Sequence, residues 1–244
     1  MNTTKLLMAG GSPLVLALAM SLSVQAAETG GVEEIIVTAQ KRTENVQTVP
    51  VAVSVISGRE LAAAGINNLE SLQEVTPSLT FSRKSTSQAA ALNIRGIGTQ
   101  SFATGAEPSV STVVDGVVLG RAGMAMAEFT DISRIEVLRG PQGTLFGKNA
   151  SAGVISIVTQ APADALGGTA SVGFAEGNEK RANVNVSGPL GDKVGVRVAG
   201  TYGEYRGNAF NYYNNKWANG YRRLGVRGKL VAEPSDNLKF TVSA

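Results

Sequence analysis

The 244-residue sequence contains no cysteine and no histidine, and aromatic residues make up only 5% of it. Without cysteine, these residues can form neither a disulfide framework nor a thiolate metal site. Without histidine, they lack the commonest general base and metal ligand. We therefore expect no catalytic site, no metal site and no bound cofactor, and we do not expect an enzyme.

A strong excess of charge is also missing, because the net charge is only +3. Residues 1–167 hold 11 Lys and Arg against 13 Asp and Glu, whereas residues 168–244 hold 11 against 6. The basic excess therefore lies in the C-terminal part of the chain. It is too small to indicate a nucleic-acid partner.

The longest apolar run lies at the N-terminus, where Lys5 precedes residues 6–22. Glycines and a proline interrupt the run, and its core is too short to span a bilayer as a helix. Small residues around Ala26 match the positions that a signal peptidase recognises. We predict a signal peptide at residues 1–26, with an N-terminal membrane anchor as the alternative.

Glycine is abundant, with 29 residues, or about 12% against a usual ~7%. This favours a turn-rich β protein. Between residues 46 and 162 the pattern predicts a small mixed α/β domain. A capping box at Ser57 and Glu60 predicts a helix that ends at Gly65, and Asn67 or Asn68 should cap a second helix through Val75. Strands are expected at residues 51–55, 79–81, 92–94, 110–114, 117–119, 134–138 and 153–159.

Turn residues separate several of these strands. Asp115 and Gly116 both tolerate positive φ, which predicts a two-residue hairpin. Between the last two strands, Pro141 and its neighbouring glycines indicate a turn region. Taken alone, this region is compatible with an ordinary hairpin in many α+β domains.

Residues 131–159 have the sequence DISRIEVLRGPQGTLFGKNASAGVISIVT. Together with LNIRG at 92–96 and VVDGV at 113–117, in this order, the stretch resembles the plug (cork) domain of TonB-dependent outer-membrane receptors. The resemblance implies an α+β plug at residues 46–162, inserted in a transmembrane β-barrel that has 22 strands in complete receptors.

Near the predicted start of the mature chain lies a β-prone segment, whose residues are Glu34, Ile35, Ile36, Val37, Thr38 and Ala39. It resembles the TonB box, the peptide that such receptors offer to the energy-coupling protein TonB. We expect an extended, unpaired strand that can add to a sheet edge of TonB. Residues 40–45 should form a mobile tether, so that residues 27–45 make up box and tether. Because only about seven residues lie between the predicted cleavage point and the box, we expect no signalling domain there, and a receptor that transports without transducing a signal.

Two polar connections, at residues 82–90 and 99–109, and one further arginine are candidates for ligand contacts. In the receptor family, loops at these places face the ligand, and the residues we select are Arg83, Gln100, Phe102 and Arg121. Solvated loops without a specific task are the alternative. Arg95, Glu136 and Arg139 lie beside strand ends, and we expect them to pair within the plug or against the barrel wall as a latch.

After a linker at residues 163–167, residues 168–244 alternate between apolar and polar side chains over five segments. Membrane β-barrel strands have this pattern, and so do soluble β-sandwiches. Short connections at 188–193 and 233–237, with a longer polar loop at 206–220, favour the barrel. Since 22 strands need roughly 300 residues and 77 are present, we expect the N-terminal part of a longer receptor.

The resemblance implies a receptor in the outer membrane of a Gram-negative bacterium, most often one for ferric siderophores. Its expected partners are TonB, an iron chelate and outer-membrane lipid. Cobalamin, other metals and carbohydrates remain open as cargo. Tyr212, Tyr213 and Trp217 in the long loop fit either ligand stacking or an aromatic girdle at the membrane interface. Alternative functions are a passive porin or adhesin, a non-transporting fragment, or a secreted β-rich enzyme.

Overall fold

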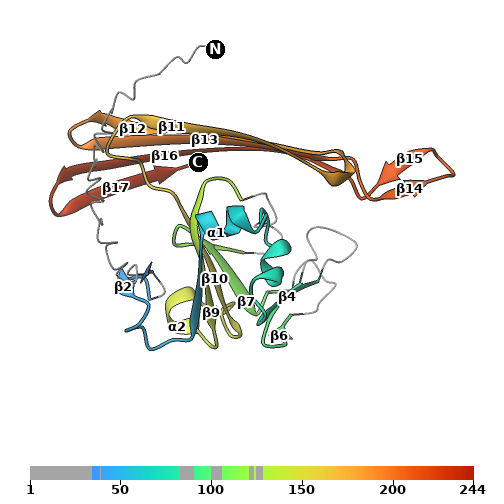
Figure 1. The fold of residues 1–244 in the computed structure, drawn as a ribbon. Coiled ribbons are helices and arrows are strands. Elements are labelled where there is room, and N and C mark those ends of the chain that lie inside the picture. Colours follow the sequence, from blue (N-terminus) through green and yellow to red (C-terminus); the bar gives the residue numbers. More distant parts are fainter. Residues whose placement is uncertain (1–34, 39, 83–90, 100–105, 121–123, 125–128) are drawn as a thin grey trace, which may run out of the picture. The chain divides into compact units, whose positions relative to one another are not determined.

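The computed structural model describes residues 35–38, 40–82, 91–99, 106–120, 124 and 129–244 (Figure 1). The predicted signal peptide lies outside these ranges. Within them, no helix has both the length and the hydrophobicity needed to cross a membrane. The described chain forms an α/β domain followed by a long antiparallel sheet, as expected from the change of pattern near residue 168.

A five-stranded mixed sheet forms the centre of the α/β domain, in the order β3-β9-β10-β7-β8. Strand β10 pairs in parallel with β7, and the other neighbours are antiparallel. The bounds are β3 (Val53–Ser57), β7 (Val110–Val114), β8 (Val117–Leu119), β9 (Ile132–Arg139) and β10 (Gly153–Thr159). The edge strand β3 begins two residues later than predicted, and β9 is longer than predicted.

The turn between β7 and β8 is the predicted two-residue hairpin. Asp115 has φ of 45° and Gly116 has φ of 85°, which are the left-handed angles that such a turn requires. The region between β9 and β10 contains more regular structure than the turn that the sequence predicts. It contains the short helix α2 (Gly143–Phe146), which buries Phe146 against the sheet.

The first predicted helix is confirmed as α1 (Gly58–Ala63), with Ser57 as its N-cap and Glu60 completing the capping box. The second differs from the prediction. Only the 3-10 helix η1 (Ser71–Glu74) forms, although the Asn68 side chain accepts a hydrogen bond from the Ser71 N–H. Because 3-10 geometry is used in short pieces, the element ends before Val75.

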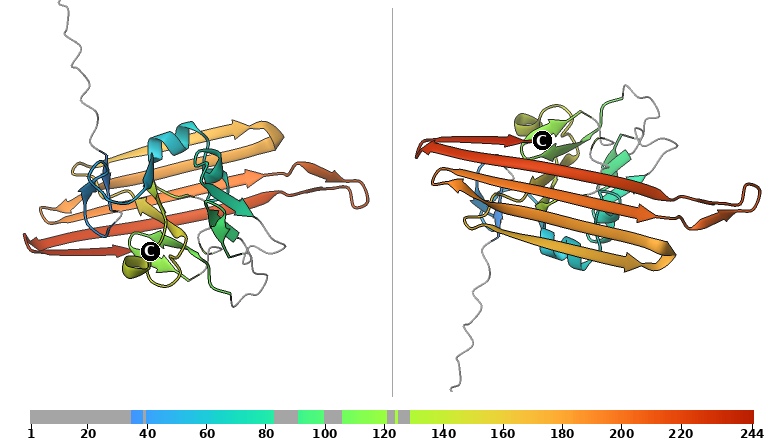
Figure 2. Two further views of the ribbon diagram at one scale, coloured as in Figure 1. Left: turned by 90° about the horizontal axis from the view of Figure 1, so that it is seen from below. Right: turned by 90° about the horizontal axis from the view of Figure 1, so that it is seen from above.

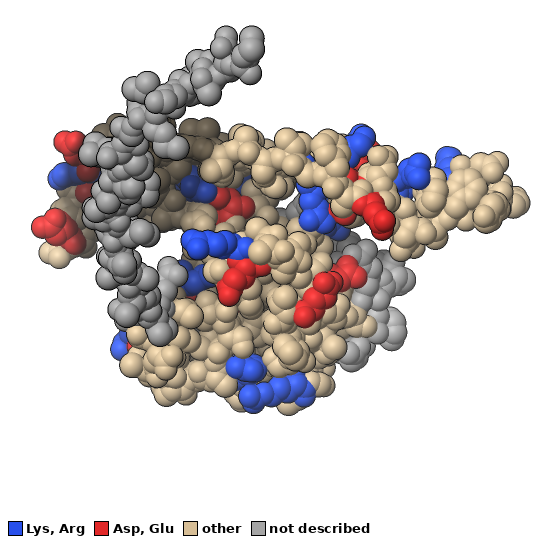
Figure 3. All heavy atoms as spheres, in the orientation of Figure 1, with Lys and Arg blue, Asp and Glu red and all other residues tan. Residues whose placement is uncertain are grey.

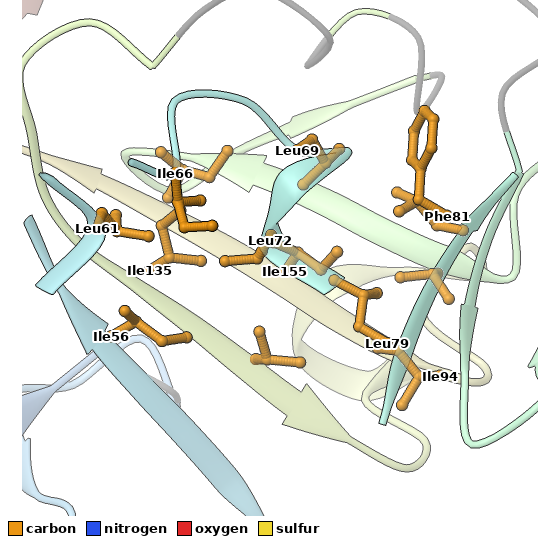
Figure 4. Close-up of a cluster of buried hydrophobic side chains, with 14 of the residues drawn as sticks. Ile56, Leu61, Ile66, Leu69, Leu72, Leu79, Phe81, Ile94, Ile135 and Ile155 are labelled. Carbon is orange, nitrogen blue, oxygen red and sulfur yellow. The ribbon is translucent and has the colours of Figure 1, made fainter. Parts of the chain in front are cut away.

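A three-stranded antiparallel sheet completes the domain, with the order β4 (Leu79–Ser82), β5 (Ala91–Ile94) and β6 (Ile97–Gly98). The main core lies between this sheet, the helices and the central sheet. Figure 4 shows side chains of the helical segment pointing toward Ile135 and Ile155 of the central sheet. Leu69 and Leu72 are fully buried there.

The five predicted C-terminal strands are confirmed as one antiparallel sheet with neighbours in the order β11-β12-β13-β16-β17. Figure 2 shows these strands lying side by side. Their bounds are β11 (Gly167–Ala175), β12 (Glu179–Gly191), β13 (Val194–Tyr205), β16 (Tyr221–Ser235) and β17 (Leu238–Ser243), with the short 3-10 turn η4 (Glu176–Asn178) between the first two. The register is regular over most of each pairing.

The two faces of this sheet differ in chemistry, because side chains alternate along a strand and antiparallel partners share a face. On one face Val172, Phe174, Leu224 and Val226 are between 71% and 79% exposed. The opposite face carries polar side chains, namely Asn183, Asn185, Arg197, Thr201, Arg227 and Lys229. An exposed apolar band of this size indicates a face that contacts lipid or another protein.

The long connection between β13 and β16 is not a simple loop. It contains a two-stranded hairpin of β14 (Ala209–Asn211) and β15 (Lys216–Ala218). Phe210 packs edge-on against Tyr212 and Trp217, with ring centroids 5.1 and 5.4 Å away. These contacts give the predicted loop a small, partly exposed aromatic cluster.

Candidate functional site

The N-terminal segment is docked on the α/β domain and is not an unpaired strand. Strand β1 (Ile36–Val37) pairs with β2 (Glu44–Asn45), and the Val46 N–H donates to the Ile35 carbonyl at 2.9 Å. The expectation of an unpaired box and a mobile tether is therefore wrong for the described residues. The reason is a side-chain pocket that the sequence pattern does not reveal.

Val37 fills this pocket and has no exposed surface. It joins a cluster whose other buried members are Val113, Leu138, Phe146, Ala150 and Val154. Ile35 and Ile36 remain 46% exposed. One side of the segment is therefore held by apolar burial, and the other side stays accessible.

The carboxylate of Glu136 holds the next residue. Its Oε1 accepts hydrogen bonds from the Thr38 N–H at 2.9 Å and from the Thr38 hydroxyl at 3.0 Å. The same oxygen accepts from Arg134 Nε at 2.7 Å, and Arg134 also donates to the Thr38 hydroxyl at 3.3 Å. The docked segment and the plug sheet thus share one small polar network.

Glu136 is completely buried, at the middle of β9. Its Oε2 has no hydrogen-bond partner in the described part of the chain. A buried carboxylate is unfavourable unless donors surround it. Two of the three donors to Oε1 come from Thr38, so the docked segment itself stabilises the charge of Glu136.

The other two predicted latch residues lie elsewhere. Arg95 is exposed, has φ of 53°, and donates its N–H to the Ser78 carbonyl. Arg139 is half-buried, and its Nε has no hydrogen-bond partner among the described residues. Glu136 pairs inside the domain with Arg134. A latch role for Arg95, Glu136 and Arg139 stays a prediction.

Several predicted site residues lie outside the described residues. These are Glu34 and Ala39 of the N-terminal segment and the four ligand candidates Arg83, Gln100, Phe102 and Arg121. Their roles stay predictions. In the long connection Tyr212, Tyr213 and Trp217 are all exposed, and Arg206 stacks over the Trp217 ring at 4.3 Å.

Two ion pairs that we did not predict link the domain to the long sheet. Asp131 receives two hydrogen bonds of 2.5 Å from Arg197 of β13. Asp115 lies 3.1 Å from Lys229 of β16. Figure 3 shows basic and acidic side chains next to one another at several places on the face that it presents. The sequence signal was weak, because each partner is a single charge far from the other in the chain.

Asp115 is also held within its own domain. Its carboxylate accepts hydrogen bonds from the Thr159 N–H at 2.9 Å and the Thr159 hydroxyl at 2.6 Å. Burial opposes ionisation, but these hydrogen bonds and the Lys229 ammonium outweigh it and lower the pKa of Asp115. The carboxylate is therefore charged at neutral pH and available to both partners.

The geometry defines an α/β domain with a docked N-terminal strand, joined to antiparallel strands that are apolar on one face. Residues 45–154 match the family model described as TonB-dependent Receptor Plug Domain. These residues form a plug domain, and the chain belongs to the TonB-dependent receptor family.

Named relatives and solved structures agree with this assignment. The chain is 33% identical over 184 residues to a pesticin receptor of Yersinia pestis, and 28% identical over 182 residues to an iron-regulated outer membrane virulence protein of Vibrio cholerae. It superposes on the ferric yersiniabactin uptake receptor FyuA from Yersinia pestis with a TM-score of 0.71 at 31% identity, covering 79% of this chain and 31% of that one.

These relatives are much longer than the chain described here. The alignments cover 74% and 69% of this chain but only 27% of each of the two relatives. The similarity thus extends beyond the plug into the C-terminal strands, and the chain spans roughly a quarter of the length of these two relatives.

Proposed function

We propose that this chain is the N-terminal part of an outer-membrane receptor of a Gram-negative bacterium, which takes up a ferric siderophore with energy delivered through TonB. The plug domain and the receptors among its relatives support this proposal. The exposed apolar face of the long sheet fits contact with outer-membrane lipid. In this proposal the chain transports and catalyses no reaction.

The observation that carries the proposal is the docking of residues 35–38 on the plug. Only two residue pairs join β1 to β2, and the remaining support comes from Val37 and the Thr38 network. A short extended segment with this limited support can leave the plug and pair with a sheet edge of a partner. We assign TonB binding to residues 34–39 on this basis.

Ligand binding and gating complete the proposed cycle. The ligand enters from outside and contacts the plug through Arg83, Gln100, Phe102 and Arg121. Binding there favours release of residues 34–39, and TonB then pulls on the released segment and displaces the plug. Arg95, Glu136 and Arg139 restrain the plug until that pull, within the plug or against the wall of the complete barrel.

The test is to replace residues 34–39 by a Gly-Ser segment of equal length in the full-length receptor. Uptake of the labelled ferric chelate should be lost, while its binding to the cell surface should be unchanged. A Gly-Ser replacement of Asp236 and Asn237, in the exposed turn between β16 and β17, serves as a control for secretion and assembly, which surface immunoblotting measures. Uptake that survives the replacement would refute TonB coupling, and uptake that also survives loss of the proton gradient would indicate a passive porin.

A further inference from the structure

Two cations lie directly opposite each other on the polar face of the long sheet. Arg197 of β13 and Lys229 of β16 are partners in the antiparallel register. Residues in this relation have Cβ atoms about 4.5–5.5 Å apart, and like charges there repel. Their side chains are only 14% and 9% exposed. Water therefore screens this repulsion poorly.

The plug supplies one carboxylate to each cation. Asp131 binds Arg197, and Asp115 binds Lys229, whose Nζ also lies 3.3 Å from the Thr159 carbonyl. The end of β10 holds both aspartates in place. The Thr159 N–H donates to the Asp115 carboxylate, and the Gln160 N–H donates to the Asp131 carbonyl. Thr159, the last residue of β10, and Gln160, directly after it, thus hold Asp115 and Asp131 beside the two cations.

A third cation on the same face is only partly satisfied. Arg227 lies two residues before Lys229 on β16, and its buried Nε has no hydrogen-bond partner among the described residues. Three cations therefore face two plug carboxylates. The face retains unused capacity for negative charge while the plug is docked.

We propose that Arg197, Arg227 and Lys229 form an anion-binding site on the polar face of the long sheet, which is the inner wall of the barrel in the proposed receptor. At rest, the carboxylates of Asp131 and Asp115 of the plug occupy this site. The inference rests on the proposed function, because it requires the plug to move. Displacement of the plug leaves the cations unpaired, and a carboxylate-bearing anion restores their partners. The plug and an anionic cargo thus use the same cations in turn, and the wall favours passage of a negatively charged chelate.

Citrate, a small tricarboxylate, is a suitable probe, and Thr130 is a suitable reporter position. Thr130 is buried, and its side chain lies so close to Gly225 of β16 that a methyl group on Gly225 would come within 2.6 Å of it. The substitution Thr130→Cys places a thiol at this contact, in a segment without any cysteine. Maleimide labels such a thiol when the plug separates from the wall.

The experiment measures the labelling rate of purified full-length T130C in citrate and in sodium chloride of equal ionic strength. The same protein without T130C gives the background. If citrate competes with the plug carboxylates, labelling should rise about tenfold when citrate is at about ten times its dissociation constant, by mass action. Chloride should have no such effect.

Removing the cations provides the decisive comparison. In R197Q/K229Q the citrate dependence should disappear, whereas R223Q should retain it, because Arg223 lies on the same face but stacks on the Tyr221 ring. Equal labelling in citrate and chloride would overturn the proposal, as would a citrate effect that survives R197Q/K229Q. The assay involves neither uptake nor TonB, so its failure is separable from failure of the proposed function.

Discussion

The substitution Glu136→Gln should loosen the docked N-terminal segment. Two hydrogen bonds join Thr38 to the buried Glu136 carboxylate. A hydrogen bond to a charged group contributes about 1.5–3 kcal/mol, whereas a neutral one contributes about 0.5–1.5 kcal/mol. Loss of the charge therefore weakens each bond by about 1 kcal/mol, or about 2 kcal/mol for the pair. This raises the population of the undocked segment roughly thirtyfold.

Hydrogen exchange measures this population directly, because the Thr38 amide exchanges only when its bond to Glu136 opens. The exchange rate of the peptide containing Thr38 should rise roughly thirtyfold in E136Q. In Thr38→Val the hydroxyl bonds to Glu136 and Arg134 are lost. Because the bond to the carboxylate alone contributes about 1.5–3 kcal/mol, the rate should rise roughly tenfold or more. Glu74→Gln, at an exposed plug glutamate, should leave the rate unchanged.

An unchanged Thr38 exchange rate in E136Q would refute the reasoning, because the carboxylate would then contribute nothing to docking. A rise across all plug amides would instead indicate general destabilisation. A rise confined to residues 35–46 is the result that we expect. If TonB binds residues 34–39 as we propose, its affinity for the full-length protein should also rise in E136Q, because a larger fraction of the segment is undocked and able to bind.

Four further predictions concern the plug and the sheet. Ser57→Ala should lower the stability of the plug by about 1 kcal/mol in chemical denaturation, through loss of the α1 cap. Hydrogen bonds from the Ser57 backbone and hydroxyl lower the pKa of Glu60. The ionised Glu60 carboxylate therefore stabilises the plug above the unfolded-state pKa of about 4.3, and this stabilisation is lost as the pH falls through the lowered folded-state pKa. Glu60→Gln should remove this acid-dependent loss, and an identical pH profile in E60Q would contradict the assignment. Gly116→Ala should destabilise the plug by about 1–2 kcal/mol, because Gly116 has φ of 85°. Gly143→Ala, in α2 with open space around it, is the control, and equal denaturation midpoints for the two variants would count against the turn geometry. Val226→Arg, on the apolar face, should destabilise the membrane-inserted full-length protein by about 2–4 kcal/mol. Ser171→Arg, at an exposed position on the polar face, should avoid this lipid penalty, and equal losses of folding in vesicles would exclude the assigned faces.

Much of the fold follows from local sequence features. The Ser57–Glu60 capping box and the Asp115-Gly116 turn act over a few residues, so the residue types alone determine them. Strict alternation likewise predicts the strands after residue 167 and the face of each side chain. Alternation could not reveal the β14–β15 hairpin, because its aromatic cluster joins residues from both arms.

The docked segment shows where local reasoning fails. Residues 35–38 form a β-prone run that is compatible with a free strand. Nothing in the neighbouring sequence indicates a pocket for the Val37 side chain. The pocket and the Glu136 carboxylate come from residues about 100 positions away. The ion pairs of Asp115 and Asp131 have the same origin, since 66 residues separate Asp131 from Arg197. Such contacts exist only once the chain has folded.

The order of strands in the plug determines how it responds to mechanical load. A force applied at residue 35 acts first on the two pairs of β1 and β2, and then on β3 from its Val53 end. β3 is an edge strand with five pairs to β9, and these can separate one after another like a zipper. The β10 and β7 strands lie further inside the sheet and are not in this series of contacts, and β9 enters it only as the partner of β3. The plug can therefore yield in stages, beginning at one edge, while most of its central sheet remains folded.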